Sequence, residues 1–189
     1  MRVISGSARG TVLHSIEDIS TRPTLDRVKE SLFNIIQGRV EDATVLDLFA
    51  GSGAIGIECL SRRAEKAYFC DKSKDAVKMI EKNLEKTRLK EKAVIYNKDY
   101  IDCINTVSNQ KFDIIFLDPP YKEEFALDAI ERMSELKLLK DEGIIIIETD
   151  EPKRDIERIN NYHSWVYEQL SPYMCGEELE KLKRATVRI

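Results

Sequence analysis

The run FDIIFLDPPY, residues 112–121, joins a buried-strand pattern directly to four residues that could do chemistry, Asp118-Pro119-Pro120-Tyr121. Two consecutive prolines cannot continue the hydrogen bonding of a sheet, so the strand must end there. Proline fixes φ and keeps the residue before it extended. These residues therefore predict two rigidly held acceptors, the Asp118 carboxylate and the Pro119 carbonyl, with the aromatic face of Tyr121 beside them.

Two acceptors in this arrangement suit the exocyclic amine of a nucleic-acid base. The lone pair of such an amine is delocalised into the ring, which makes the amine a poor nucleophile. Preorganised acceptors for its two N–H bonds turn the lone pair toward an electrophile. Asp118 could also take the proton that the product amine sheds, while Tyr121 stacks on the base. An ordinary turn at a strand end, where Asp and Pro are common, is the alternative.

A glycine-rich run, VLDLFAGSGAIG at residues 45–56, lies between a predicted strand and a predicted helix. Gly51 permits a tight turn, Gly53 lets the backbone approach a ligand, and Gly56 lets the helix pack closely on the sheet. The spacing matches the G-x-G-x-x-G pattern, and Asp71 follows Gly51 by 20 residues, as the ribose-binding acid does in NAD-binding folds. NAD is therefore one ligand that this run could hold.

S-Adenosylmethionine fits the neighbouring acids better than NAD does. Asp47 precedes the glycines, where its charge would oppose a pyrophosphate but favour the sulfonium and ammonium groups of S-adenosylmethionine. Asp71 and Asp99 follow the next two predicted strands and could accept from the ribose hydroxyls and the adenine amine. Because parallel strands end at one edge of a sheet, Asp118 should share that crevice. Each acid taken alone could instead be structural, as a satisfied carboxylate, a helix-start acid or a loop acid.

The residues expected to hold this cofactor lie at the strand ends, in the glycine-rich run or at the start of the first helix. They are Asp47, Phe49, Gly51, Ser52, Gly53, Asp71, Asp99, Tyr100 and Thr24.

The elements that must position these residues alternate along the chain. Apolar runs predict strands, and amphipathic patterns between them predict helices, one of which opens at Ser73 as an N-cap. The expected strands cover 44–49, 67–70, 93–96, 112–117 and 143–148, and the expected helices cover 53–62, 73–87 and 124–137. This alternation predicts an α/β fold, a parallel sheet with helices on both faces.

The two ends of the chain differ from this central pattern. Residues 1–20 predict a short β-hairpin extension, and residues 24–37 predict a leading amphipathic helix. Two late strands, in SWVYEQL and KLKRATVRI, are expected to form an antiparallel pair. With no long linker, residues 1–189 are interpreted as one domain, whose cofactor-binding catalytic core covers 44–189.

The composition narrows the class of protein. No run approaches 18 apolar residues and the N-terminus lacks an apolar signal core, so a cytoplasmic protein without a membrane span is expected. Two histidines and four cysteines at unrelated spacings (Cys59, Cys70, Cys103, Cys175) predict neither a metal site nor a disulfide framework. The net charge of -4 argues against a uniformly basic surface, although the first 40 residues are locally basic.

The sequence resembles the RsmD family of 16S rRNA guanine-N2 methyltransferases. The resemblance is carried by MRVISGSARG, by RPTLDRVKESLFNII at 22–36, by VLDLFAGSGAIGIECLSRRA at 45–64 and by FDIIFLDPPY. It implies a class I, Rossmann-like three-layer sandwich, with a mostly parallel seven-stranded sheet, an antiparallel C-terminal strand and an N-terminal hairpin. It further implies S-adenosylmethionine as cofactor and 16S rRNA as substrate, within an assembling 30S subunit. Cys70-Asp71 departs from the glutamate common in the family, and the C-terminal tail matches little.

Contacts with RNA are expected mainly from the N-terminal segment. Arg9, Arg22 and Arg27 could contact phosphates or stack on bases, as Tyr121 could on the target base, although each arginine could also be a plain surface residue. Thr24 could face either the cofactor or the RNA.

Three other functions remain open from the sequence. Adenine-N6 methylation of DNA or RNA uses the same chemistry, but the DNA enzymes usually need a recognition domain for which the chain has little room. An NAD-dependent dehydrogenase would leave Asp47 and Asp118 without roles. A non-catalytic RNA-binding protein would not need the intact residues 118–121.

Overall fold

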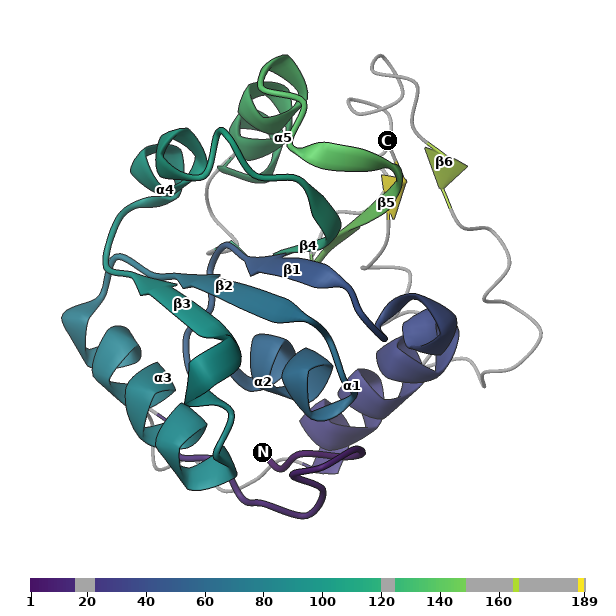
Figure 1. Ribbon diagram of the computed structural model, residues 1–189, viewed down its shortest axis with the longest axis vertical. Helices are drawn as coiled ribbons and strands as arrows, with labels where there is room; N and C mark the ends of the chain where they lie inside the picture. The colour runs from purple at the N-terminus through teal and green to yellow at the C-terminus, as the bar shows by residue number, and fades with distance from the viewer. Residues whose placement is uncertain (16–22, 120–124, 149–164, 167–186, 189) are drawn as a thin grey trace.

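The computed structural model describes residues 1–15, 23–119, 125–148, 165–166 and 187–188. Within that part, seven strands form one sheet in the order β3-β2-β1-β4-β5-β7-β6 (Figure 1). The strands are β1 Thr44–Asp47, β2 Lys66–Cys70, β3 Ala93–Tyr96, β4 Phe112–Leu117, β5 Leu139–Ile147, β6 Trp165–Val166 and β7 Val187–Arg188. Strands β1 to β5 pair in parallel, and β7 runs antiparallel to β5 and to β6. The predicted antiparallel pairing of the two late strands is confirmed.

Helices cover both faces of the sheet, as the alternating pattern predicts. The helices are α1 Pro23–Ile36, α2 Ala54–Ser61, α3 Lys74–Thr87, α4 Tyr100–Thr106 and α5 Phe125–Glu135, with short 3-10 helices η1 Gln37–Arg39 and η2 Lys90–Lys92. Figure 1 shows α1, α2 and α3 on one face and α4 and α5 on the other. The molecule is therefore a three-layer sandwich over the described residues.

The alternation of side chains along each strand builds two separate cores. Val45 and Ile114 face the layer of α1, α2 and α3, and the next residues, Leu46 and Ile115, face the layer of α4 and α5. These pairs are also register partners, since Val45 lies opposite Ile114 and Leu46 opposite Ile115. A slip of one residue would exchange the two cores, so burial on both faces fixes the register.

Most of the expected elements are confirmed, although several of their bounds differ and one helix is additional. Ser73 caps α3 as predicted, because its Oγ accepts a hydrogen bond from the Ala76 N–H at 3.3 Å. Helix α4 was not predicted. It begins after Asp99, whose Oδ1 accepts from the Asp102 N–H at 2.9 Å and so acts as the N-cap. Strand β1 ends at Asp47, two residues before the expected end, and β5 begins at Leu139, four residues before the expected start.

The N-terminal arm, defined here as residues 1–15, has the hairpin character expected of residues 1–20. Arg2 and Val12 form an antiparallel bridge, and the Val3 N–H donates to the Thr11 carbonyl at 2.9 Å. At the turn, Gly6 has a φ of +82° and presses against Ser61 at the end of α2, so that a Cβ there would lie 1.7 Å from the Ser61 carbonyl oxygen. The arm therefore lies tightly against the helical layer (Figure 1).

A buried carboxylate, Glu58 of α2, anchors the arm. Its two oxygens accept hydrogen bonds from the Ile4 N–H at 2.8 Å and the Ser5 N–H at 3.0 Å. They also pair with Lys29 Nζ of α1 at 3.1 Å and with Arg62 Nε at 2.8 Å. Glu58 is 0% exposed, and every one of these contacts compensates for the water that it has lost.

Lys29 completes this network between the arm and α1. Its Nζ also donates to the Arg2 carbonyl at 2.6 Å, and only 3% of the residue is exposed. Burial lowers the pKa of Lys29, and the neighbouring Glu58 opposes that shift. The arm, α1 and α2 thus share one ion network.

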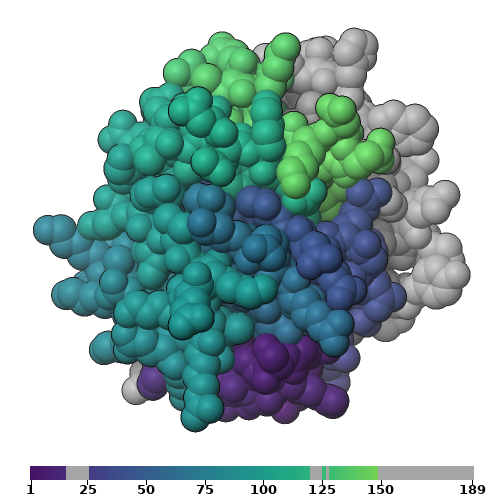
Figure 2. All heavy atoms as spheres, in the orientation of Figure 1, coloured from purple at the N-terminus to yellow at the C-terminus, as the bar shows by residue number. Residues whose placement is uncertain are grey.

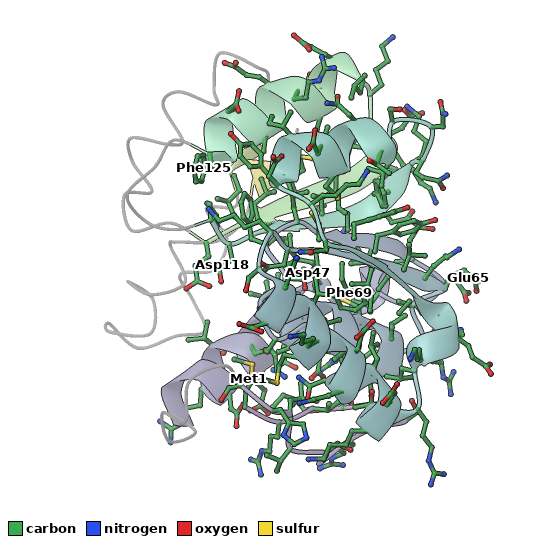
Figure 3. All side chains as sticks on the ribbon, turned by 90° about the vertical axis from the view of Figure 1, so that its left-hand side faces the viewer. Met1, Asp47, Glu65, Phe69, Asp118 and Phe125 are labelled. Atoms are coloured by element: carbon green, nitrogen blue, oxygen red, sulfur yellow. The ribbon has the colours of Figure 1, made fainter. Side chains whose placement is uncertain are left out.

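Replacement of Glu58 by Gln should destabilise the fold by about 3 kcal/mol or more, because the buried Lys29 cation loses the carboxylate with which it is paired. Chemical denaturation, followed by circular dichroism, measures the free energy of unfolding. Glu65→Gln is the matched control, since Glu65 is exposed and directly precedes β2 (Figure 3). Equal stability of the two variants would contradict the anchoring role of Glu58.

Candidate active site

Four acids gather at the carboxyl edge of the sheet. Asp47 is the last residue of β1, and Asp71, Asp99 and Asp118 follow β2, β3 and β4. These strands are neighbours in the order β3-β2-β1-β4, so the acids lie along one edge, as the spacing predicts. Asp47 and Asp118 flank the point between β1 and β4 where the strand order reverses, the usual ligand position in open α/β sheets. Figure 3 shows both near that edge, with Glu65 at the opposite one.

Asp47 is a buried carboxylate with an unusual proton affinity. It is 4% exposed, and its Oδ2 accepts a hydrogen bond from the Gly56 N–H at 3.2 Å. Burial raises the pKa of Asp47 to about 7, with a further rise from Asp71, while the Gly56 hydrogen bond opposes the shift. A cation placed near Asp47 would offset part of the free-energy cost of burying the charged carboxylate, whereas a phosphate would increase that cost. The site is therefore suited to a positively charged ligand.

The glycine loop, defined here as residues 50–53, is held by the acid that follows β2. Gly51 has a φ of +53°, and its N–H donates to Asp71 Oδ2 at 2.9 Å. Asp71 Oδ1 accepts from the Ser73 N–H at 2.8 Å, so the carboxylate joins the loop to the start of α3. Each oxygen keeps a further lone pair, which leaves Asp71 able to accept from a ligand hydroxyl.

Two glycines, Gly51 in the loop and Gly56 in α2, have different surroundings. A Cβ on Gly51 would meet nothing within 4 Å, so the loop faces open space at that point. A Cβ on Gly56 would lie 2.3 Å from Phe69 Cε1, which confirms the predicted close packing of α2 on the sheet. The first position leaves room for a ligand and the second fixes the helix that follows.

An aromatic wall borders the acids. The Phe49 and Tyr100 ring centroids are 5.6 Å apart, and Tyr100 and Phe125 are 5.0 Å apart. Tyr100 Oη donates to Asp128 Oδ2 of α5 at 2.6 Å, and Lys72 Nζ lies 6.0 Å from the Phe125 ring centroid. Such a wall suits the flat face of an adenine.

Sequence reasoning predicted two of the three rings, Phe49 and Tyr100, and missed Phe125. Its position directly after Asp-Pro-Pro-Tyr-Lys-Glu-Glu is the signal that could have identified it, since the chain must return to the same edge there. Asp128 could not be inferred, because only the packing of α4 against α5 brings it to Tyr100.

Asp118 has a raised proton affinity, although its residue surface is exposed. Partial burial of the carboxyl group raises its pKa to about 7, and the carboxylates of Glu148 and Asp47 raise it further. Pro119, the next residue, is buried. A carboxyl group with a raised pKa on an exposed residue suits proton exchange with a bound substrate.

The remaining predicted residues divide between the described part of the chain and the rest. Pro120, Tyr121 and Arg22 lie outside the described residues. Three of the others are exposed: Arg9 in the turn of the N-terminal arm, Arg27 on α1 and Asp99 at the N-cap of α4. Ser52 is half-buried in the glycine loop. The backbone of Thr24 lies in the first turn of α1.

No cluster of three or more His, Cys, Asp or Glu side chains in the described residues could hold a metal ion. None of the described helices has the length and apolarity needed to cross a membrane.

Comparison with known proteins gives a consistent match. The family model described as Conserved hypothetical protein 95 matches residues 1–171. The Ribosomal RNA small subunit methyltransferase D of Haemophilus influenzae is 38% identical, over 81% of this chain and 80% of its own. The solved structure of the Escherichia coli protein yhhF superposes with a TM-score of 0.68 at 34% identity, covering 79% of this chain and 80% of its own.

A more distant structure shares the fold alone. SMU.776, solved in complex with S-adenosylhomocysteine, has a TM-score of 0.66 at 18% identity, covering 89% of this chain and 49% of its own. Together with the nearer relatives it confirms the expected class I methyltransferase fold.

The raised pKa of Asp47 makes the stability of the protein depend on pH. Its folded pKa of about 7 exceeds the ordinary 3.8, so the folded state holds the extra proton between these values. Stability should therefore fall as pH rises from about 4 to about 7, by up to about 1.4 kcal/mol per pH unit. Asp47→Asn removes the group that causes this pH dependence. The unfolding free energies of wild type and variant should therefore differ by an amount that changes with pH across that range.

The control is Asp75→Asn, at an exposed position of α3. The wild type and this variant should keep a constant difference in unfolding free energy across the same pH range. A constant difference for Asp47→Asn as well would show that Asp47 ionises normally.

Proposed function

The chain belongs to the family described as Conserved hypothetical protein 95, the RsmD family, and on that premise we propose that it methylates the N2 amine of a guanine in 16S rRNA. It is a methyltransferase whose cofactor is S-adenosylmethionine. The observation that supports methyl transfer to an exocyclic amine is Asp118, which precedes the buried Pro119 at the end of β4 and lies across the strand-order reversal from Asp47. The choice of a guanine in 16S rRNA rests on the family.

The residues at the carboxyl edge fit the cofactor. We assign the glycine loop and Asp47 to its cationic methionine part, Asp71 to the ribose, and Asp99 with the aromatic wall to the adenine. Thr24 is proposed as a further contact to the methionine part. When bound, the cofactor supplies a methyl group on a sulfonium, so that an S–C bond breaks as the N–C bond forms.

Asp118 carries the protein's part of the chemistry. Its carboxylate accepts one N–H of the target amine, and the Pro119 carbonyl accepts the other, which aims the lone pair away from both acceptors. Its pKa of about 7 lies near the operating pH, where a general base works best. The carboxylate can therefore take the proton that the methylated amine releases. Pro120 keeps the proposed role of a rigid support, and Tyr121 that of a stacking platform for the base.

The RNA is proposed to reach this site across the N-terminal arm and α1. Arg9 and Arg27 are exposed there, and Arg22 lies between them in the sequence. A target in folded rRNA, within an assembling 30S subunit in the cytoplasm, would present its own shape, and extrusion of the base would bring it to the Tyr121 platform. This would explain how a chain with a net charge of -4 acts on RNA.

The direct test supplies tritiated S-adenosylmethionine with 16S rRNA, 30S particles or DNA, and then identifies the labelled nucleoside by chromatography. N2-methylguanosine from 16S rRNA is expected. Label in adenine, or in DNA only, would favour the adenine-N6 methyltransferase instead. Titration calorimetry with NAD tests the dehydrogenase alternative, which the Asp47 carboxyl group beside the glycine loop disfavours because a negative charge there would repel the pyrophosphate.

Catalysis should depend on the ionisation of Asp118. Since only the carboxylate can act as acceptor and base, the rate should rise with pH and level off above about 7. Glu148→Gln removes a carboxylate that raises the pKa of Asp118, so the acid limb of the pH–rate profile should move to lower pH. Asp118→Asn should lower kcat at least about 100-fold while calorimetry still finds cofactor binding.

A pH profile that is identical in wild type and Glu148→Gln would contradict the electrostatic coupling. Full activity of Asp118→Asn would contradict the proposed role of Asp118 itself.

A further inference from the structure

Asn83 of α3 is a fully buried amide that joins two segments far apart in the sequence. Its Nδ2 donates to the Ser52 carbonyl of the glycine loop at 2.9 Å and to the His14 carbonyl of the N-terminal arm at 3.0 Å. Its Oδ1 accepts from the His14 N–H at 2.8 Å. The exposed fraction of Asn83 is 0%, so none of these groups has water as a substitute partner.

The three hydrogen bonds admit only one orientation of the amide. Both of its N–H groups are used, and the opposite flip would place two carbonyl oxygens against Oδ1. A buried donor or acceptor that loses its partner is costly, so a movement of Ser52 must be followed by Asn83, and through it by His14. Asn83 thus behaves as a rigid link between the two segments.

The glycine loop has further attachments to the same helix. Asp71, just before α3, accepts a hydrogen bond from the Gly51 N–H. Gly53 packs against Ile80 of α3, because a Cβ added to Gly53 would lie 3.2 Å from Ile80 Cγ1. The loop therefore sits on α3, and whatever fixes the loop also fixes the surface of α3 that holds Asn83.

The arm is attached independently at its other end. The Ala8 N–H donates to Ser61 Oγ at 3.0 Å, and the Ser7 N–H donates to the Ser61 carbonyl at 2.8 Å. Figure 2 shows the arm as one compact purple patch on the surface. It is thus held by α2 near its turn and by Asn83 at His14, and the contact at His14 is the one that Asn83 shares with the glycine loop.

We propose that Asn83 is a positioning residue that couples the glycine loop to the N-terminal arm, so that cofactor binding and RNA binding strengthen each other. The inference rests on the proposed function, because it takes the arm as part of the RNA contact. Coupling of this kind is reciprocal, so the cofactor should tighten RNA binding by the factor by which RNA tightens cofactor binding.

Hydrogen exchange read by mass spectrometry tests the link without relying on activity. In the wild type, saturating S-adenosylmethionine should slow amide exchange both in the glycine loop and in the arm. In Asn83→Ala the loop should still be protected, while the arm should exchange as it does without cofactor. Asn83→Asp, which keeps the acceptor for the His14 N–H but loses the amide donors, should behave in the same way.

Thr87→Val is the matched control. Thr87 is also polar and buried on α3, but its Oγ1 donates only to the Asn83 and Leu84 carbonyls of the same helix. This variant loses a buried hydrogen bond and some stability, yet it should transmit protection to the arm as the wild type does. Loss of transmission in Thr87→Val would reduce the role of Asn83 to general stability and overturn the proposal.

Kinetics separate positioning from chemistry. Asn83→Ala should raise the KM for 16S rRNA about tenfold at saturating cofactor, with kcat changed less than about threefold. Protection that still reaches the arm in Asn83→Ala, or an unchanged KM, would overturn the coupling. Cofactor-dependent protection of the arm that requires Asn83, found without any methyl transfer to 16S rRNA, would support the coupling and contradict the proposed substrate.

Discussion

The parallel register of β1 against β2 and β4 is the constraint on which the site depends. Burial on both faces fixes that register, because Val45 and Leu46 belong to different cores. Once it is fixed, the strands must end at one edge, and the acids that follow them must approach each other there. Burial, with a smaller contribution from neighbouring carboxylates, then raises the pKa of Asp47 and of Asp118 toward neutrality. The fold thus creates the proton affinity that the proposed chemistry uses.

Two buried acids in neighbouring elements show how differently the protein treats charge. Glu58 has two cationic partners and two backbone donors, and it joins α1, α2 and the N-terminal arm. Asp47 accepts a hydrogen bond from the Gly56 N–H and has the Asp71 carboxylate, rather than a cation, as its charged neighbour. The first acid is satisfied within the chain and is structural. The second is left with a cost that a cationic ligand would reduce, which is the behaviour expected of a binding site.

The sequence predicted what depends on local pattern and missed what depends on packing. Apolar runs located the five parallel strands, and the glycine spacing located the loop. Helix α4 was missed because Tyr100–Thr106 covers only 7 residues, too few to show a clear helical period of apolar residues. Phe125 and Asp128 come to Tyr100 only through the packing of α5. Glu58 and Asn83 have partners up to 69 residues away, which no periodicity reveals.

The central claim is the proposal that this protein methylates a guanine N2 in 16S rRNA and needs Asp118 to do so, and the rRNA of a strain that lacks this protein tests it most directly. Nucleoside mass spectrometry would compare that strain with the same strain carrying either the wild-type chain or Asp118→Ala. The account predicts that one N2-methylguanosine is missing from 16S rRNA in the deletion strain and returns only with the wild-type chain. An unchanged N2-methylguanosine content in the deletion strain, or its full restoration by Asp118→Ala, would contradict the account.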